Sequence, residues 1–340
     1  MPHDSSPPFS LEPQRLSLLD LAIVGKGQTP ADALAGSVRL AQAAERLGVA
    51  RIWYAEHHNM QSIASSAPAV LIAHIAAHTS TIRLGAGGVM LPNHSPLTIA
   101  EQYGTLATLH PGRIELGLGR APGSDQVTMR AMRRDHTSSD TFPEDVLEVM
   151  GYLAGESRVS GVSAVPGAGT NVPVYILGSS LFGAQLAAQL GLPFAFASHF
   201  APEALRDAVA IYRRGFLPSA VLDRPRVLAA VNVICADTDA EAHHQLRVAA
   251  RWRVQRFLNL PADLDDEQLD RVIAAPQGQQ IVRMMTYTAA GDPTSVAAYL
   301  TQFAEHAGAD ELVLALSSPT IDERLRSLEL VASAATVAAA

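Results

Sequence analysis

The sequence alternates eight times between a short apolar run and a longer segment with helical patterning, and this alternation constrains the fold more than any other feature. The apolar runs lie at residues 15–24, 50–57, 82–91, 113–120, 172–180, 193–200, 226–236 and 310–318. They are almost continuously apolar, as strands buried on both faces are. Eight such units in 340 residues predict the α/β class, as a (β/α)8 TIM barrel. A doubly wound sheet is the alternative, although it usually has fewer strands and a visible switch point.

Two long segments interrupt the alternation, so we expect insertions after strands 4 and 7. Residues 121–141 are polar and carry several arginines, and residues 251–292 add helical material before the last strand. Long excursions from a compact domain are usually functional loops or lids. Residues 251–292 are a candidate lid, because Met284, Met285 and Tyr287 could line an apolar substrate pocket; ordinary helix packing of these side chains is the alternative. We expect residues 1–340 to form a single domain.

Composition argues against several classes of protein. The net charge is −8, so neither nucleic acid nor an anionic membrane is an expected partner. Cys235 is the single cysteine, which excludes an internal disulfide and a cysteine-based zinc site. The N-terminal residues lack the pattern of a signal peptide, and no apolar stretch has the length of a membrane span. We therefore expect a soluble, cytoplasmic protein.

Residues suited to ligand binding or catalysis occur at the ends of the expected strands. In a (β/α)8 barrel the residues at the C-terminal ends of the strands line the active site. In this sequence they are Asp20, Glu56, His57, His58, Gly87, Gly88, Gly119, Arg120, Gly178, Ser179, Ser180, Ser198 and His199. Taken singly, adjacent histidines or glycines in loops often have no catalytic role. Their occurrence at six successive strand ends predicts that they converge on one site.

The sequence Gly178-Ser179-Ser180 is a candidate phosphate site. It follows an apolar strand and precedes a helix, where backbone N–H groups bind anions and small residues let the anion approach. Arg120, at the end of the neighbouring strand, could add a forked positive charge to the same phosphate. An ordinary serine N-cap is an equally plausible interpretation.

Gly87 and Gly88 remove two side chains where the third strand reaches the mouth of the barrel. A flat ring could then lie against bare backbone, and glycine also tolerates unusual dihedral angles at ligand sites. Other catalytic motifs are missing: GLGRAPG has Pro122 where a dinucleotide fingerprint needs glycine, and no Gly-x-Ser-x-Gly elbow occurs. His74 and His78 have a helical i,i+4 spacing without an intervening glutamate, so we predict no metal site.

Four motifs together resemble those of the bacterial luciferase-like flavin monooxygenases. They are YAEHH, GAGGVMLPNHSPLTIAEQYGTLATLHPGRIELGLGR, VYILGSS and GLPFAFASHF. The resemblance extends from residue 16 to about residue 316, and it is closest to the single-subunit, alkanal-monooxygenase-like oxidoreductases. It implies a barrel that binds FMN, usually as reduced FMN supplied by a separate flavin reductase.

The resemblance also implies roles for individual residues. His57 matches the active-site histidine beside the flavin, and Glu56 matches an acid at the same strand end. Gly87-Gly88 matches a non-proline cis peptide that presses on the flavin ring. Ser198 falls near the ring. The phosphate-binding positions correspond to Arg120, Gly178, Ser179 and Ser180.

Asp20 is a further candidate cofactor contact, because it ends the first strand. Two departures from the luciferase pattern argue against light emission and long-chain aldehyde specificity. Gly119 stands where the luciferase catalytic subunit carries a reactive cysteine, and His199 replaces a tryptophan.

These observations predict an FMN-dependent oxidoreductase acting on paired donors, with incorporation of molecular oxygen into a small organic substrate. His57 is the expected general acid or base, because an imidazole has an unperturbed pKa of about 6.5. Glu56 either orients His57 or caps nearby backbone. The alternatives are an F420-dependent hydride-transfer enzyme and a non-catalytic flavin-binding protein. We expect a homodimer, with the apolar segment 67–78 near its interface.

Overall fold

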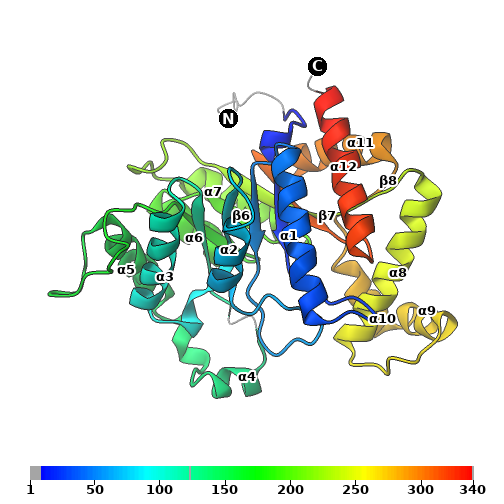
Figure 1. The fold of residues 1–340 in the computed structure, drawn as a ribbon, viewed down its shortest axis with the longest axis horizontal. Helices are drawn as coiled ribbons and strands as arrows, with labels where there is room; N and C mark the ends of the chain where they lie inside the picture. Colours follow the sequence, from blue (N-terminus) through cyan, green and yellow to red (C-terminus); the bar gives the residue numbers. More distant parts are fainter. Residues whose placement is uncertain (1–8, 122–123, 339–340) are drawn as a thin grey trace.

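The computed structural model describes residues 9–121 and 124–338, and within them nine parallel strands form the centre of the molecule (Figure 1). The strands are β1 (Leu16–Asp20), β2 (Arg51–Tyr54), β3 (Arg83–Met90), β4 (Ile114–Gly119), β5 (Val174–Gly178), β6 (Phe194–Phe196), β7 (Val227–Cys235), β8 (Thr288–Gly291) and β9 (Glu311–Leu316). Their order is β6-β5-β4-β3-β2-β1-β9-β7-β8, and β6 also pairs with β7. That last pairing closes a ring of eight strands, so the prediction of a (β/α)8 barrel is confirmed.

β8 stands outside the ring. Residues 227–229 of β7 pair with β6, whereas residues 232–235 pair with β8. On its other edge β7 pairs with β9 over residues 228–233. The strand is thus long enough to close the barrel with its first half and to hold an extra strand with its second half.

Helices between the strands cover the outside of the barrel (Figure 1). They are α1 (Pro30–Arg46), α2 (Pro68–Ala76), α3 (Pro96–Leu109), α5 (Phe142–Ala154), α6 (Leu181–Leu190), α7 (Leu205–Gly215), α11 (Pro293–Ala307) and α12 (Ile321–Ala338). The start of α1 is fixed by a capping box, in which Thr29 and Asp32 satisfy each other's backbone N–H groups. None of the helices in the described ranges has the length and apolar character that a bilayer span requires.

The insertions after β4 and β7 are confirmed, and both lie at one end of the barrel. The first contains α4 (Gln126–Ala131) and the 3-10 helix η3 (His136–Ser139). The second contains the end of α8 (Asp239–Phe257), then α9 (Asp266–Ala274) and α10 (Pro276–Arg283). In Figure 1, α4, α9 and α10 lie along the lower edge, where the strands end and α1 begins. The insertions therefore flank the mouth of the barrel.

The interior of the barrel contains a buried ion cluster. Arg51 is fully buried, and its Nε lies 2.8 Å from Glu115 Oε2. Its guanidinium also pairs with Glu311, which accepts a hydrogen bond from Ser17. Burial lowers the pKa of Arg51, but the two carboxylates outweigh burial and raise the pKa overall. Arg51 therefore stays charged inside the barrel, with two carboxylates as partners.

Candidate active site

Glu56 is the centre of a hydrogen-bonded cluster just beyond β2. Its carboxylate is fully buried, and Oε1 lies 2.9 Å from His58 Nε2 and 2.8 Å from His94 Nε2. The Asn93 amide donates to Oε1 over 3.3 Å, and the backbone N–H of Met90 donates to Oε2 over 3.1 Å. Burial raises the pKa of Glu56, but the hydrogen bonds from His94, His58 and Met90 outweigh it, so the pKa is lowered overall. Glu56 is therefore ionised and bridges β2 to the end of β3.

Of the two roles expected for Glu56, the structure shows the capping of nearby backbone, through the Met90 N–H. His57, between Glu56 and His58, is half-buried, and its backbone N–H donates to Ser65 O over 3.0 Å. Its ring is near enough to His199 to influence the titration of that imidazole. The ends of β2 and β6 are thus brought together.

His199 and Ser198 lie directly after β6. The Ser198 hydroxyl is buried and donates to Ala230 O over 2.6 Å. His199 is 8% exposed, and Asn232 donates to its backbone oxygen over 2.7 Å. Its ring Nδ1 is buried and has no hydrogen-bond partner within the part of the chain that is described. Burial first, and then the charges of Arg253 and His57, lower the pKa of His199 to about 3, so this imidazole is neutral.

The peptide bond between Gly87 and Gly88 is cis, at the position that the family resemblance implies. At this point the β3–β4 pairing slips by one residue, because Ala86 faces Leu116 while Val89 faces Leu118. A Cβ on Gly87 would lie 2.8 Å from Trp53 Cβ, and one on Gly88 would lie 2.8 Å from the Gly117 oxygen. Neither position has room for a side chain, so the strand presents only backbone here.

The residues predicted to bind a phosphate lie around the start of α6. Ser179 and Ser180 are exposed, and Ser180 is the N-cap residue but makes no side-chain capping bond. The guanidinium of Arg120 lies 4.2 Å from the ring centroid of Phe182, in the first turn of α6, and its Nε donates to Ser139 O over 3.4 Å. The hydroxyls, the helix N-terminus and one arginine form a donor set that suits a phosphate.

Asp20 is the last residue of β1, at this rim, and both of its carboxylate oxygens accept hydrogen bonds from nearby residues of the chain. Its Oδ1 accepts from the Ala22 N–H over 2.9 Å, and its Oδ2 accepts from the Ser37 hydroxyl over 2.5 Å. These bonds fix the loop between β1 and α1. A contact between Asp20 and the cofactor stays a prediction.

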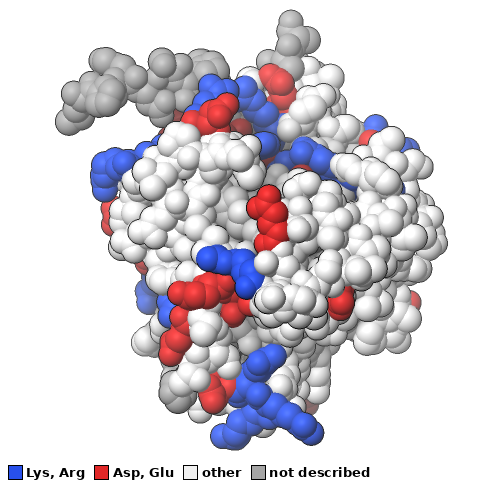
Figure 2. Space-filling model, turned by 90° about the vertical axis from the view of Figure 1, so that its left-hand side faces the viewer, with Lys and Arg blue, Asp and Glu red and all other residues white. Residues whose placement is uncertain are grey.

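The insertion after β4 forms a cavity beside both the Glu56 cluster and Arg120. Its volume is about 410 Å³, and it is lined by Pro92, Asn93, Gln126, Met129, Arg130, Arg134, Asp135, Ser138 and Ser139. Arg134 donates to Asn93 O, while Ser139 accepts from Arg120. Lys and Arg side chains gather at the lower end of the face in Figure 2, the end of the molecule where α4 lies. The lining of the cavity itself carries two arginines, Arg130 and Arg134, and one carboxylate, Asp135.

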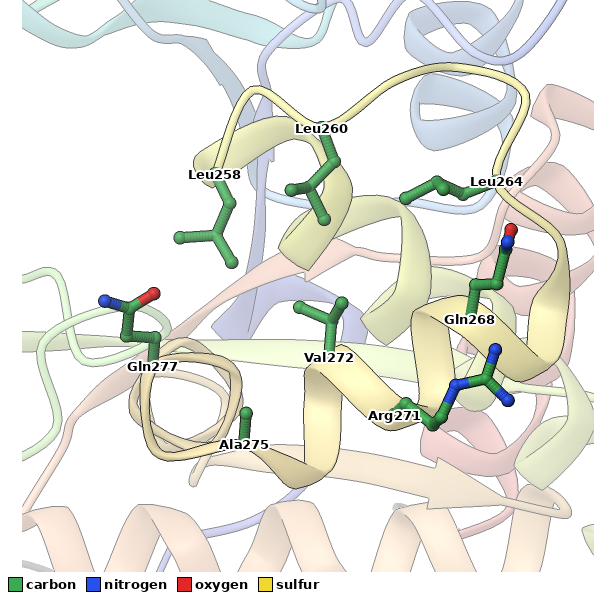
Figure 3. Close-up of a pocket in the computed structure, with 8 residues that line it drawn as sticks. All are labelled: Leu258, Leu260, Leu264, Gln268, Arg271, Val272, Ala275 and Gln277. Atoms are coloured by element: carbon green, nitrogen blue, oxygen red, sulfur yellow. The ribbon is translucent and has the colours of Figure 1, made fainter.

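The insertion after β7 encloses a separate hollow. Its volume is about 590 Å³, and Figure 3 shows Leu258 and Leu260 of the α8–α9 loop on the side opposite Val272. Arg251 joins α8 to α9 through Asp270, at 2.6 Å, and Asp266, at 2.5 Å. Tyr287 packs against Phe303 of α11, with ring centroids 4.9 Å apart. For Tyr287 the structure thus shows ordinary helix packing.

His58, expected at this mouth together with Glu56 and His57, lies there. His94, Asn93 and Asn232 also belong to the site, although the sequence did not single them out. His94 and Asn93 are within the motif GAGGVMLPNHSP, but they do not stand at strand ends. The described residues contain no group of three or more His, Cys, Asp or Glu side chains arranged to hold a metal ion.

The closed parallel barrel and the cis Gly87–Gly88 peptide agree with the resemblance to the luciferase-like enzymes. The chain belongs to the luciferase-like monooxygenase family, whose sequence profile matches residues 16–311. The family indicates an oxidoreductase.

Several known proteins are similar over nearly the whole chain. The Bacillus subtilis protein YvbT is 46% identical over 324 residues, which cover 93% of this chain and 95% of YvbT. A luciferase-like monooxygenase of Escherichia coli K12 is 45% identical, with 92% and 95% covered. The crystal structure of apo-MsnO8 superposes with a TM-score of 0.84 at 36% identity, covering 95% of this chain and 97% of that one.

Two more distant structures share the fold at lower identity. They are the oxygenating constituent of 3,6-diketocamphane monooxygenase in complex with FMN, at 16%, and an F420-dependent secondary alcohol dehydrogenase in complex with an F420-acetone adduct, at 18%. At this level the likeness shows the fold alone.

Proposed function

We propose that this protein is a monooxygenase that uses reduced FMN and O2 to oxygenate a small organic substrate. One observation carries the proposal: the bare Gly87–Gly88 peptide on β3 lies between the histidine end of β2 and Arg120 at the end of β4. The serine turn follows on β5, next in the ring. Adjacent strands lie about 4.8 Å apart. Four neighbouring strand ends therefore carry, in order around a single rim, His57, the Gly87–Gly88 backbone, Arg120 and the serines Ser179 and Ser180.

The residues present fit FMN. Arg120, Ser179 and Ser180 would hold the phosphate, and Gly87–Gly88 would support the flavin ring. Gly178, Ser198 and Asp20 are further proposed contacts from the same rim. When bound, reduced FMN would supply the reaction with O2, which is chemistry that side chains do not provide.

We assign the acid/base role to His57 and a positioning role to Glu56. Glu56 holds His94 and His58 and fixes the backbone at Met90, so it orders the mouth without touching the substrate. Replacing His57 with alanine should leave FMN affinity within about twofold and reduce turnover by about 10²–10⁴, the usual contribution of a general acid or base. Turnover equal to that of the wild type would refute this assignment.

The reaction class is tested by oxygen consumption. The purified chain is mixed anaerobically with FMNH2 or with reduced F420. Cofactor oxidation is followed first without O2 and then, together with O2 uptake, after O2 is added. Enzyme-dependent O2 uptake with FMNH2 supports a monooxygenase. Oxidation of reduced F420 by a carbonyl substrate without O2 would instead support hydride transfer, and binding without either reaction would support a non-catalytic flavin protein.

The remaining parts of the proposal concern partners. Reduced FMN would come from a separate flavin reductase, and the whole chain would act as one catalytic domain within a homodimer in the cytoplasm. Sedimentation at micromolar concentration tests the dimer. A single species with the mass of one 36.0 kDa chain would contradict it.

A further inference from the structure

Arg253 carries a positive charge that the protein leaves without an anion. It is near the C-terminal end of α8, and its Nη1 is buried with no hydrogen-bond partner. No carboxylate within residues 9–121 and 124–338 forms an ion pair with it, whereas Arg251, two residues earlier, is held by Asp266 and Asp270. Burial lowers the pKa of Arg253, and no acid offsets this effect. The residue as a whole is half-buried. Withdrawing part of a charge from water is costly unless the charge is paired, so the unpaired guanidinium points to a ligand that completes the pair.

The position of Arg253 places this charge at the mouth of the barrel. Burial and then the charge of Arg253 lower the pKa of His199, the residue that follows β6, and His57 lowers the same pKa further. Arg253 thus reaches the catalytic end from the insertion after β7. The phosphate donors Arg120 and Ser179 come instead from β4 and β5, so the mouth has two separate sources of positive charge.

His199 adds an unused hydrogen-bonding atom, because its Nδ1 is buried without a partner among the described residues. His199 is neutral, so a single positive charge is left to be balanced. One guanidinium balances a monoanion, and its planar fork matches a carboxylate.

We propose that Arg253 binds a carboxylate group of the substrate, so that the substrate is a small organic acid. The inference deepens the proposed function, on which it rests, by naming the chemical class of the substrate. In this arrangement Arg120, Ser179 and Ser180 bind the phosphate of FMN. Arg253 and His199 bind the carboxylate of the substrate. The substrate carbon to be oxygenated would then lie between them, beside His57.

The test compares two probes of the same chain length, one with an anionic and one with a neutral head group. Hexanoate and hexanamide are titrated into the full-length protein without FMN at constant ionic strength. Binding is followed by tryptophan fluorescence, because Trp53 and Trp252 are the two tryptophans, and by thermal shift. Hexanoate should bind at least tenfold more tightly than hexanamide. The preference should vanish in Arg253→Met, remain in part in Arg253→Lys, and persist in Arg247→Met, a control at an exposed position of the same helix.

FMN affinity is measured on the same variants. If Arg253→Met binds FMN as the wild type does but no longer prefers hexanoate, the proposal holds. Weaker FMN binding by tenfold or more would assign the guanidinium to the cofactor and overturn it, as would a wild type that does not distinguish the two probes. If Arg253→Met does not fold, Arg253→Lys decides: an undiminished preference together with tenfold weaker FMN binding refutes the carboxylate site. A hexanoate preference in a protein that does not bind FMN would refute the FMN function and leave the carboxylate site standing.

Discussion

Replacing Glu56 with glutamine should destabilise the protein by about 3 kcal/mol at pH 7. The Asn93 amide donates to Oε1 and the Met90 N–H donates to Oε2, so the new amide NH2 would oppose one of these donors in either orientation. The ionic bonds to His58 and His94 would also lose the carboxylate charge. A hydrogen bond to a charged group contributes about 1.5–3 kcal/mol. Two such contributions are lost, and we take the lower end because the His58 and His94 side chains are 22% and 29% exposed.

Urea unfolding followed by circular dichroism measures this change as a shift of the midpoint at constant slope. Glu267→Gln is the matched control, because that side chain is 90% exposed and its Arg271 partner is 4.0 Å away, so a change below about 0.5 kcal/mol is expected. The folded-state pKa of Glu56 lies below its ordinary 4.5, so its contribution is complete above that pH and is lost as the pH falls through the folded-state pKa. A loss below 1 kcal/mol at pH 7, or a wild-type advantage that grows on acidification, would refute the reasoning.

Three further predictions concern the platform, the phosphate site and the cysteine. Gly87→Ala should lower the free energy of unfolding in urea by about 1–3 kcal/mol, because the added Cβ would lie 2.8 Å from Trp53. It should also weaken FMN binding in a fluorescence titration. Unchanged stability would contradict this packing. Arg120→Met should raise the Kd for FMN about tenfold and leave that for riboflavin unchanged, since riboflavin lacks the phosphate; equal losses would place Arg120 elsewhere. Burial first, and then Asp292 and Asp237, raise the pKa of Cys235 to about 12, so a disulfide reagent at pH 8 should label it only after unfolding; rapid labelling of the native protein would contradict this.

The barrel could be predicted because its strands are buried on both faces and each is followed by a helix with start signals such as Thr29-Pro30. The extra strand β8 could not be predicted from the sequence, because its four residues, Thr288–Gly291, are too few to show a pattern. It exists because β7 extends past the barrel and offers a free edge. That edge is a product of tertiary structure rather than of the local sequence.

The candidate site likewise has residues that the sequence predicts and residues that it does not. Residues directly at strand ends, such as His57, Arg120 and Ser179, follow from the geometry of any parallel barrel. His94 and Arg253 come from a loop and an insertion, whose path depends on packing. His94 reaches Glu56 only because the short helix η2 (Leu91–Asn93) turns the chain back beside β2. No periodicity in the sequence encodes such a turn.

The three consecutive residues Glu56, His57 and His58 have different contacts. Glu56 bonds to His58 and to His94. The backbone N–H of His57 donates to Ser65 O, and the charge of His57 contributes to lowering the pKa of His199. His199, with a pKa of about 3, stays neutral throughout the working range and cannot exchange a proton there. In the proposed mechanism this leaves His57 as the proton carrier, with Glu56 holding the backbone at Met90.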